Sequence, residues 1–260
     1  MTYNSSDTKN IDIYSIPVYY ISFGKNLNLE KRLSEQGFIN VNHFEAIDGK
    51  KLKPDDLRLQ RKITVRAYND LIQNRGETWG IPSLGAIGCT SSHNELWKKC
   101  VNENLNHIII VENDLVFKDK FSDDDIKFIN YSLRKPKSAF FGSRTYKSNN
   151  MKVLDGTQFC ILSKDCCKEL SNNVFPIEVQ TDVYIAHMAN IGLIEFKCRF
   201  LTTQKQHNSL IQDFCFKCML PNKNNFYYGW VLIWVLILIV LLCFIYYYIK
   251  AYRVCMENKI

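Results

Sequence analysis

Residues 106–118 read NHIIIVENDLVFK, and this stretch decides the fold class of the chain. Three isoleucines and a valine lead directly into Glu112, Asn113 and Asp114, after which the sequence becomes apolar again. A short continuous apolar run of this kind is typical of a strand that is buried on both faces of a parallel sheet. Ligands collect at the carboxyl ends of such strands, so the two acids stand where a binding site is expected.

Strands and helices alternate on both sides of this stretch. The expected strands are Ile16 to Phe23, His107 to Val111, Ser138 to Gly142, Gln158 to Ser163 and Leu193 to Cys198. The expected helices are Asn28 to Gln36, one beginning at Ser92, Lys164 to Asn172, Thr181 to Ile191, and one or two short helices within Lys53 to Gly80. The alternation predicts an α/β domain whose mostly parallel sheet is covered on both faces.

Signals at the helix ends refine these expectations. Ser92 with Glu95 three residues later is a capping-box pattern, which places His93 in the first turn of a helix. Thr181 is expected to cap a later helix, and Gly37 is expected to end the first helix in a left-handed conformation.

The acidic pair suits a metal ion. With one residue between them, Glu112 and Asp114 can reach one divalent cation while Asn113 faces elsewhere. Mg²⁺ and Mn²⁺ prefer carboxylate oxygens and usually bind substrate phosphates as well. An ion there would neutralise the charge that develops on a diphosphate leaving group. The alternative is a turn with two surface acids, because acid-x-acid triplets are common.

Several separated stretches carry a family pattern. The most specific are GAIGCTSSHNELWKK at residues 85–99 and IIIVENDLVF at 108–117. In the same order along the chain stand FEAIDG (44–49), GTQFCILSKDCCKEL (156–170), TDVYIAH (181–187) and TTQKQHNSLI (202–211). From about Ile16 to Ile211 the chain resembles glycosyltransferase family 25, which includes lipopolysaccharide-biosynthesis and procollagen galactosyltransferases.

The resemblance implies a GT-A type, Rossmann-like fold that binds a nucleotide sugar. It also implies a divalent metal, Mn²⁺ or Mg²⁺, and an inverting transfer of a hexose, galactose or glucose, from a UDP-hexose donor. The acceptor would be a hydroxyl of a glycan, a lipid-linked glycan or a protein. Glu112 and Asp114 map onto the acidic motif of the family, but Asn113 replaces its central acid. That departure keeps open a catalytically inactive, glycosyltransferase-like structural membrane protein.

The resemblance also assigns roles to single residues. Asp182 maps onto a later aspartate of the family and is the candidate base that removes the acceptor proton; an acid in the first turn of a helix is, however, favoured by the helix dipole in any protein. The donor-binding candidates are Arg32, Asp48, His93 and Glu112. For His93 the alternative is a structural hydrogen bond, for Arg32 a solvated helix position, and for Asp48 an ordinary turn.

Residues 228–249, YGWVLIWVLILIVLLCFIYYYI, contain no charge. At ~1.5 Å per residue a helix of this length spans the ~30 Å hydrocarbon core, so we expect a transmembrane helix. The expected organisation is a polar segment (1–12), a catalytic domain (13–213), a juxtamembrane linker (214–227), the span (228–249) and a tail (250–260). A C-terminal tail anchor favours a cytoplasmic catalytic domain, in a host or virion membrane if the source is viral. The flanking lysines slightly favour the opposite orientation, which leaves the topology open.

The charge distribution indicates which partners to expect, and the cysteines indicate whether the thiols are reduced. The net charge of +7 comes from dispersed lysines rather than from a basic stripe, so no nucleic-acid partner is expected. The ten cysteines are scattered, and Cys166 and Cys167 are adjacent, which favours reduced thiols. Cys215 and Cys218 form a single CxxC without the second pair of a structural zinc site.

Overall fold

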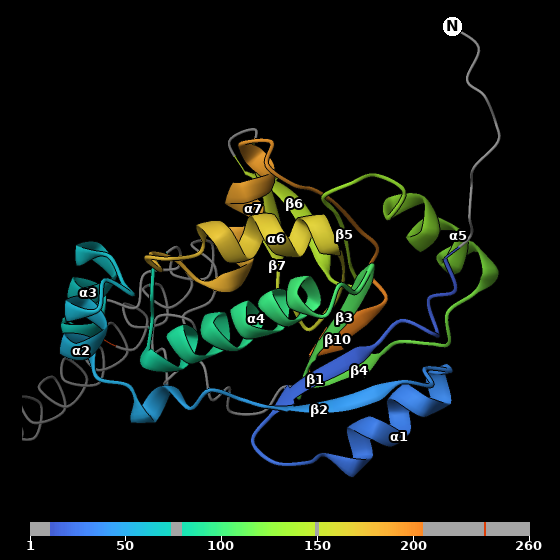
Figure 1. Ribbon diagram of the computed structural model, residues 1–260, viewed down its shortest axis with the longest axis horizontal. Helices are drawn as coiled ribbons and strands as arrows, with labels where there is room; N and C mark the ends of the chain where they lie inside the picture. Colours follow the sequence, from blue (N-terminus) through green and yellow to red (C-terminus); the bar gives the residue numbers. More distant parts are fainter. Residues whose placement is uncertain (1–10, 74–79, 149–150, 205–236, 238–260) are drawn as a thin grey trace, which may run out of the picture. The chain divides into compact units, whose positions relative to one another are not determined.

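The computed structural model describes residues 11–73, 80–148, 151–204 and 237 (Figure 1). The chain divides into two units, Met1–Asp213 and Phe214–Ile260. The strands of the first unit are β1 (Val18–Ser22), β2 (Val41–Glu45), β3 (His107–Glu112), β4 (Leu115–Phe117), β5 (Ser138–Phe141), β6 (Arg144–Ser148), β7 (Met151–Asp155), β8 (Phe159–Ser163), β9 (Glu195–Cys198) and β10 (Thr202–Gln204). Its helices are α1 (Leu27–Gln36), the 3₁₀ helix η1 (Gly49–Lys51), α2 (Pro54–Leu59), α3 (Val65–Ile72), α4 (Leu84–Asn102), α5 (Asp123–Ser132), α6 (Lys164–Asn173) and α7 (Thr181–Asn190).

Six strands form the central sheet in the order β2-β1-β3-β8-β5-β9. β1 is parallel to β2 and β3, and β5 is parallel to β9, which confirms an α/β domain with a parallel-rich sheet. The sheet is less parallel than the sequence predicts, because β8 is antiparallel to both β3 and β5. An apolar strand has the same residue pattern in either direction, so its sequence does not reveal the reversal. The reversal brings the residues before β8 to the edge where β3 ends, with Val111 opposite Phe159.

β2 is a strand that the apolar pattern does not indicate. It lies at the edge of the sheet, its side chains are half-buried or exposed, and it carries the polar residues Asn42 and His43. β2 pairs with only one other strand, β1, and its side chains are not fully buried, so it does not need a continuous apolar run.

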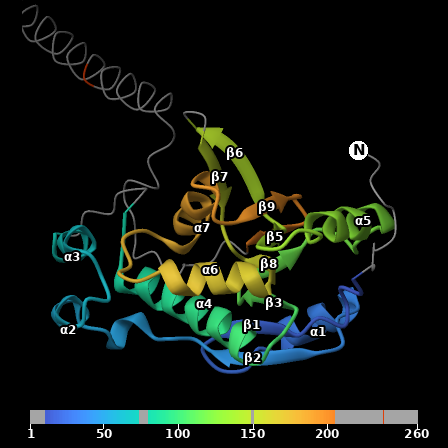
Figure 2. The ribbon, with the colours of Figure 1, turned by 45° about the horizontal axis from the view of Figure 1, so that its top comes forward.

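Apolar side chains fill both faces of the sheet, because successive residues of a strand point to opposite sides. Ile108 and Ile110 of β3 belong to a core with α4, α6 and α7, and Ile109 and Val111 belong to a second core with α1 and α5. Figure 2 shows α4 and α6 side by side, as in Figure 1. The domain therefore has three layers, with β3 buried in the middle one, as its sequence predicts.

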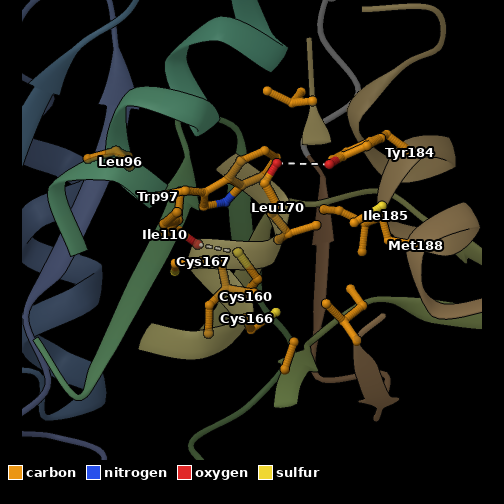
Figure 3. Close-up of a cluster of buried hydrophobic side chains, with 14 of the residues drawn as sticks. Leu96, Trp97, Ile110, Cys160, Cys166, Cys167, Leu170, Tyr184, Ile185 and Met188 are labelled. Atoms are coloured by element: carbon orange, nitrogen blue, oxygen red, sulfur yellow. Dashed lines mark hydrogen bonds between the residues drawn. The ribbon is translucent and has the colours of Figure 1, made fainter. Parts of the chain in front are cut away.

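The core between α4, α6 and α7 is shown in Figure 3. Trp97 of α4 is fully buried, and its ring lies 6.1 Å from the ring of Tyr184 on α7. Tyr184 donates a hydrogen bond of 2.8 Å to the carbonyl of Leu170 on α6. Cys166 and Cys167 are buried free thiols in this core, where they act as small hydrophobic side chains. These contacts fix α7 against α4.

The prediction that Ser92 and Glu95 start a helix is wrong. Ser83 is the N-cap of α4, so the helix begins more than two turns before Ser92. The Ser92 hydroxyl is fully used inside the structure: it donates to the carbonyl of Gly88 at 2.8 Å and accepts from the amide of Ile47 at 2.9 Å. A serine in the interior of a helix can satisfy its hydroxyl in this way without capping a new helix.

The ends of α1 and α7 give one confirmation and one correction. Gly37 ends α1 with a φ of 112°, in the left-handed region, as expected. Gln180, not Thr181, is the N-cap of α7. The hydroxyl of Thr181 lies 2.9 Å from the hydroxyl of Thr90 on α4 instead, because the start of α7 is buried against that helix.

Asp125 is expected to stabilise the start of α5. Ser122 and Asp125 form a capping box, and Arg199 donates to Asp125 at 2.8 Å. Burial raises the pKa of Asp125, but the Ser122 hydrogen bonds and the Arg199 charge outweigh it, so the pKa lies below its ordinary value. Asp125→Ala should therefore lower the free energy of unfolding at neutral pH by about 1–2 kcal/mol.

The difference between this variant and the wild type should shrink as the pH falls through the folded-state pKa of Asp125, because protonation then removes the same interactions from the wild type. Urea unfolding at several pH values measures both effects. Asp124→Ala is the matched control, because Asp124 is exposed and its pair with Lys127 at 3.6 Å is a surface contact. An equal loss in both variants would contradict the role of Asp125.

Within the described part of the chain, no helix is long and apolar enough to cross a bilayer. Apart from Ile237, the expected membrane span lies outside the described residues, as do the juxtamembrane linker, the Cys215–Cys218 pair and the end of the last family-like stretch.

Candidate active site

Glu112, the last residue of β3, is the centre of the site. Its carboxylate accepts hydrogen bonds from the hydroxyl of Thr157, in the loop before β8, and from Nε2 of His93 on α4, 3.3 Å away. An ionised carboxylate only accepts, so Nε2 carries the proton. Burial raises the pKa of Glu112, but the His93 and Thr157 interactions outweigh it, and the net pKa lies below its ordinary value. Two elements thus hold Glu112 as a carboxylate.

Asp114 lies in the turn between β3 and β4. Its Oδ1 atom is buried and has no hydrogen-bond partner among the described residues. Burial, and then the charge of Glu112, raise the pKa of Asp114 to about 6. A cation beside both carboxylates would offset the burial of the charge and their mutual repulsion. The pair therefore fits the divalent metal that the sequence predicts.

Asn113, between the two acids, is turned to another part of the structure. It is exposed, and its Oδ1 accepts a hydrogen bond of 2.6 Å from Asn26, the N-cap of α1. The central residue of the triplet therefore binds the loop between β1 and α1, while the outer two form the acidic pair.

Asp182 is in the first turn of α7 and is half-buried. Burial raises the pKa of Asp182 and the charge of Glu112 raises it further, while backbone N–H groups, first that of Val183 and then that of Gly156, lower it in part. Val183 makes the local hydrogen bond, at 2.8 Å. The net pKa lies above its ordinary value. Asp182 follows Thr181, whose hydroxyl lies 3.8 Å from the Cys89 sulfur, and that sulfur is within 4.8 Å of a ligand atom of Glu112, so the start of α7 lies close to Glu112.

Two residues of the site were not candidates from the sequence pattern. Thr157 is buried against Glu112, and Cys89 lies on α4 one turn before His93. One ligand atom each of Cys89, His93 and Glu112 lie within 4.8 Å of one another. The Thr181 hydroxyl is 3.8 Å from the Cys89 sulfur. Cys89 and Thr157 could have been found from the sequence only through their positions inside the family-like stretches 85–99 and 156–170.

His93 is not where the sequence predicts it. It is fully buried in the interior of α4, and not in a first turn with free N–H groups, because the helix begins at Ser83. Its ring bonds Glu112 instead of being exposed at a helix end. The structure thus joins His93 to the acidic pair by a contact that the sequence does not indicate.

The other two predicted donor-binding residues stabilise loops. Arg32, on α1, donates to the carbonyl of Leu115, directly after the acidic turn, and to the carbonyl of Asn28 at 3.3 Å. Asp48 is the N-cap of η1 and accepts from the amide of Lys50 at 2.9 Å, so the predicted turn is a short 3₁₀ helix. Arg32 thereby stabilises the acidic turn through a hydrogen bond to the residue that follows Asp114.

Glycines allow the η1 loop to pack directly on the backbone of α4. A Cβ on Gly88 would lie 2.4 Å from the carbonyl oxygen of Ile47, and a Cβ on Gly49 would lie 2.2 Å from that of Leu84. Gly→Ala inside a helix ordinarily stabilises by ~1 kcal/mol. We expect the opposite sign for Gly88→Ala, a loss of about 1–3 kcal/mol, because two backbones must separate.

Chemical denaturation of Gly88→Ala measures this loss. Ser91→Ala in the same helix is the control, because Ser91 is half-buried and its replacement adds no atoms; we expect a change within about 0.5 kcal/mol. A stabilised Gly88→Ala variant would show that the two backbones are not in contact.

Fold and site together define a class of protein. The chain is a parallel-rich α/β protein with carboxylates gathered at the carboxyl edge of its sheet, where proteins of this architecture bind phosphate-bearing ligands. The model of glycosyltransferase family 25, described as LPS biosynthesis protein, matches residues 16–185, well over half of the chain. The chain belongs to glycosyltransferase family 25.

Curated relatives match shorter stretches. A Drosophila melanogaster protein named Glycosyltransferase 25 family member is 27% identical over 127 residues, which are 48% of this chain and 20% of that protein. Procollagen galactosyltransferase 2 of Homo sapiens is 31% identical over 83 residues, 32% of this chain and 12% of that protein. The matched part of the chain thus spans a fifth or less of the length of these relatives.

Proposed function

We propose that residues 13–213 form a metal-dependent, inverting hexosyltransferase with a GT-A type fold. The donor is a nucleotide sugar, UDP-galactose or UDP-glucose, and the acceptor is a hydroxyl of a glycan, a lipid-linked glycan or a protein. Family membership supports the reaction class. The observation that carries the proposal is the buried, unpartnered Oδ1 atom of Asp114, two residues after Glu112. The start of α7, which bears Asp182, lies close to Glu112, because the Thr181 hydroxyl is 3.8 Å from the Cys89 sulfur and that sulfur is within 4.8 Å of a ligand atom of Glu112.

In this proposal, Glu112 and Asp114 hold Mn²⁺ or Mg²⁺ on the donor side. When bound, the ion neutralises the charge that develops on the diphosphate of the departing nucleotide. The chain contributes the orientation of the ligands: Thr157 and His93 fix the Glu112 carboxylate, and Arg32 supports the strand after Asp114 through the Leu115 carbonyl. Such second-sphere contacts align metal ligands before the donor arrives.

Asp182 acts as the base that accepts the proton of the attacking hydroxyl. A general base works best when its pKa is close to the working pH. Burial of Asp182 and the charge of Glu112 move its pKa upward, toward that range. The start of α7, packed against α4 through Thr181 and Thr90, keeps the carboxylate in place.

We further propose that residues 228–249 anchor the domain in a membrane, with the domain on the cytoplasmic side. The uncharged apolar stretch supports this. Anchoring raises the effective concentration of membrane-bound acceptors, so a lipid-linked glycan or a membrane glycoprotein suits the enzyme.

A donor screen tests the function. The full chain in detergent micelles is incubated with a panel of sugar nucleotides, with and without Mn²⁺, and nucleotide release is measured. We expect release from one UDP-hexose, only in the presence of the metal. Donor binding without release with every acceptor tried, or no binding of any donor, would overturn the proposed transferase and support the inactive, structural homologue.

A further inference from the structure

We infer that Cys89, His93 and Glu112 form a second metal site, selective for a zinc-like cation, which shares Glu112 with the proposed donor-side site. The binding itself does not depend on the proposed function and is measured without turnover. Only its consequence for catalysis, competition for Glu112, rests on the proposed hexosyltransferase.

Local geometry assembles the three ligands. Cys89 and His93 are four residues apart on α4, so both side chains lie on the same face of the helix. Glu112 reaches that face from the end of β3, and one ligand atom of each residue lies within 4.8 Å of the other two. Bonds of about 2.3 Å to sulfur and about 2.0–2.1 Å to nitrogen place two ligands of a tetrahedral zinc ion about 3.5 Å apart. Small side-chain rotations close this difference.

The protein leaves the ligand capacity of His93 largely unused. The ring is fully buried, and its Nδ1 atom has no hydrogen-bond partner in the described part of the chain. Its Nε2 atom is 3.3 Å from Glu112, longer than the about 2.7–2.9 Å of a strong charge-assisted hydrogen bond. A neutral histidine carries one proton, which can move from Nε2 to Nδ1, and this would free Nε2, the nitrogen beside Glu112, to bind a cation.

The electrostatic surroundings of Cys89 also favour a cation. The Cys89 sulfur lies 3.8 Å from the hydroxyl of Thr181, the residue before Asp182, and within 4.8 Å of a ligand atom of Glu112. A divalent ion at this position would offset the charge of the neighbouring acids, and its binding would release the thiol proton to solvent.

The two sets of ligands select different metals. Asp114 with Glu112 offers only oxygens, which suits Mn²⁺ and Mg²⁺, whereas a thiolate and an imidazole beside Glu112 suit Zn²⁺. Zinc bound to Cys89 and His93 on α4 would also bind the Glu112 carboxylate and so make it unavailable to manganese. We therefore expect zinc to inhibit manganese-dependent turnover.

Cobalt substitution tests the site, because Co²⁺ bound to a thiolate has a charge-transfer band in the near ultraviolet. The full chain is used in a background with Cys215→Ser and Cys218→Ser, which removes the CxxC thiols. We expect one cobalt per chain with this band, displaced by zinc. Cys89→Ser should abolish it, and Cys198→Ser is the matched control, because Cys198 is the other half-buried free thiol of the described chain.

A second measurement needs no variant of the site. Zinc should slow alkylation of Cys89 at least about tenfold, mapped by mass spectrometry, and leave alkylation of Cys198 unchanged. A cobalt–thiolate band that survives Cys89→Ser, or no protection of Cys89 by zinc, would overturn the inference. Asp114→Asn should keep the cobalt band but lose the manganese-dependent turnover of the donor. If the band is present but no donor is turned over, the proposed function fails and the zinc site stands.

Discussion

Asp114→Asn is expected to lower manganese-dependent turnover of the donor by at least ~100-fold. A metal that neutralises a diphosphate leaving group contributes several kcal/mol to the transition state, and ~2.7 kcal/mol corresponds to a factor of ~100. The metal-free variant should be at least as stable as the wild type. The Asp114 carboxylate is partly buried beside Glu112 with one oxygen unpartnered, so asparagine removes a repulsive charge.

Turnover, manganese affinity by calorimetry and the melting temperature separate these effects. Asn113→Asp is the matched control: it restores an acid to the triplet, but the side chain at this position faces Asn26, so we expect less than about a threefold change in manganese affinity. If Asp114→Asn retains manganese affinity, or Asn113→Asp raises it strongly, the ligand assignment is wrong. Glu112→Gln should reduce both manganese affinity and the cobalt band, because Glu112 belongs to both sites.

Asp182→Asn is expected to lower transfer to the acceptor by about 10²–10⁴-fold, the usual contribution of general-base catalysis. Donor and manganese affinity should change by less than about threefold, because the proposed role of Asp182 is on the acceptor side. The wild-type rate should fall as the pH drops through the pKa of Asp182, since a protonated carboxyl cannot accept a proton. Burial raises that pKa, so this limb should lie above the ordinary carboxylate range, and the variant should lack it.

Asp165→Asn is the control, because Asp165 is also an acid in the first turn of a helix, α6, but is exposed. Transfer and donor hydrolysis are followed separately across pH, together with thermal melting. If Asp182→Asn loses stability and donor binding along with transfer, the residue is a helix-start acid with a structural role and not the base.

Local patterns predicted much of the fold. The apolar run before Glu112 is a buried strand, and the helix after Ser163 runs from Lys164 to Asn173, within a residue of its predicted end. Local patterns failed where a polar residue had a long-range partner. Ser92 resembles a helix cap, but its hydroxyl binds the amide of Ile47, 45 residues away in sequence.

The sequence by itself determined the α/β class, the acidic pair at the end of a strand, the family and the apolar stretch near the C-terminus, because all of these depend on residue order over short distances. Only the tertiary structure decided that β8 runs against β3, and that His93, Thr157 and Cys89 surround Glu112. Thr157 and Glu112 are 45 residues apart, and no local preference records such a contact. The contact arises because α4 and the antiparallel strand β8 both pack against β3. Their packing brings His93 and Thr157 to the end of β3, where the buried Glu112 carboxylate needs hydrogen-bond donors.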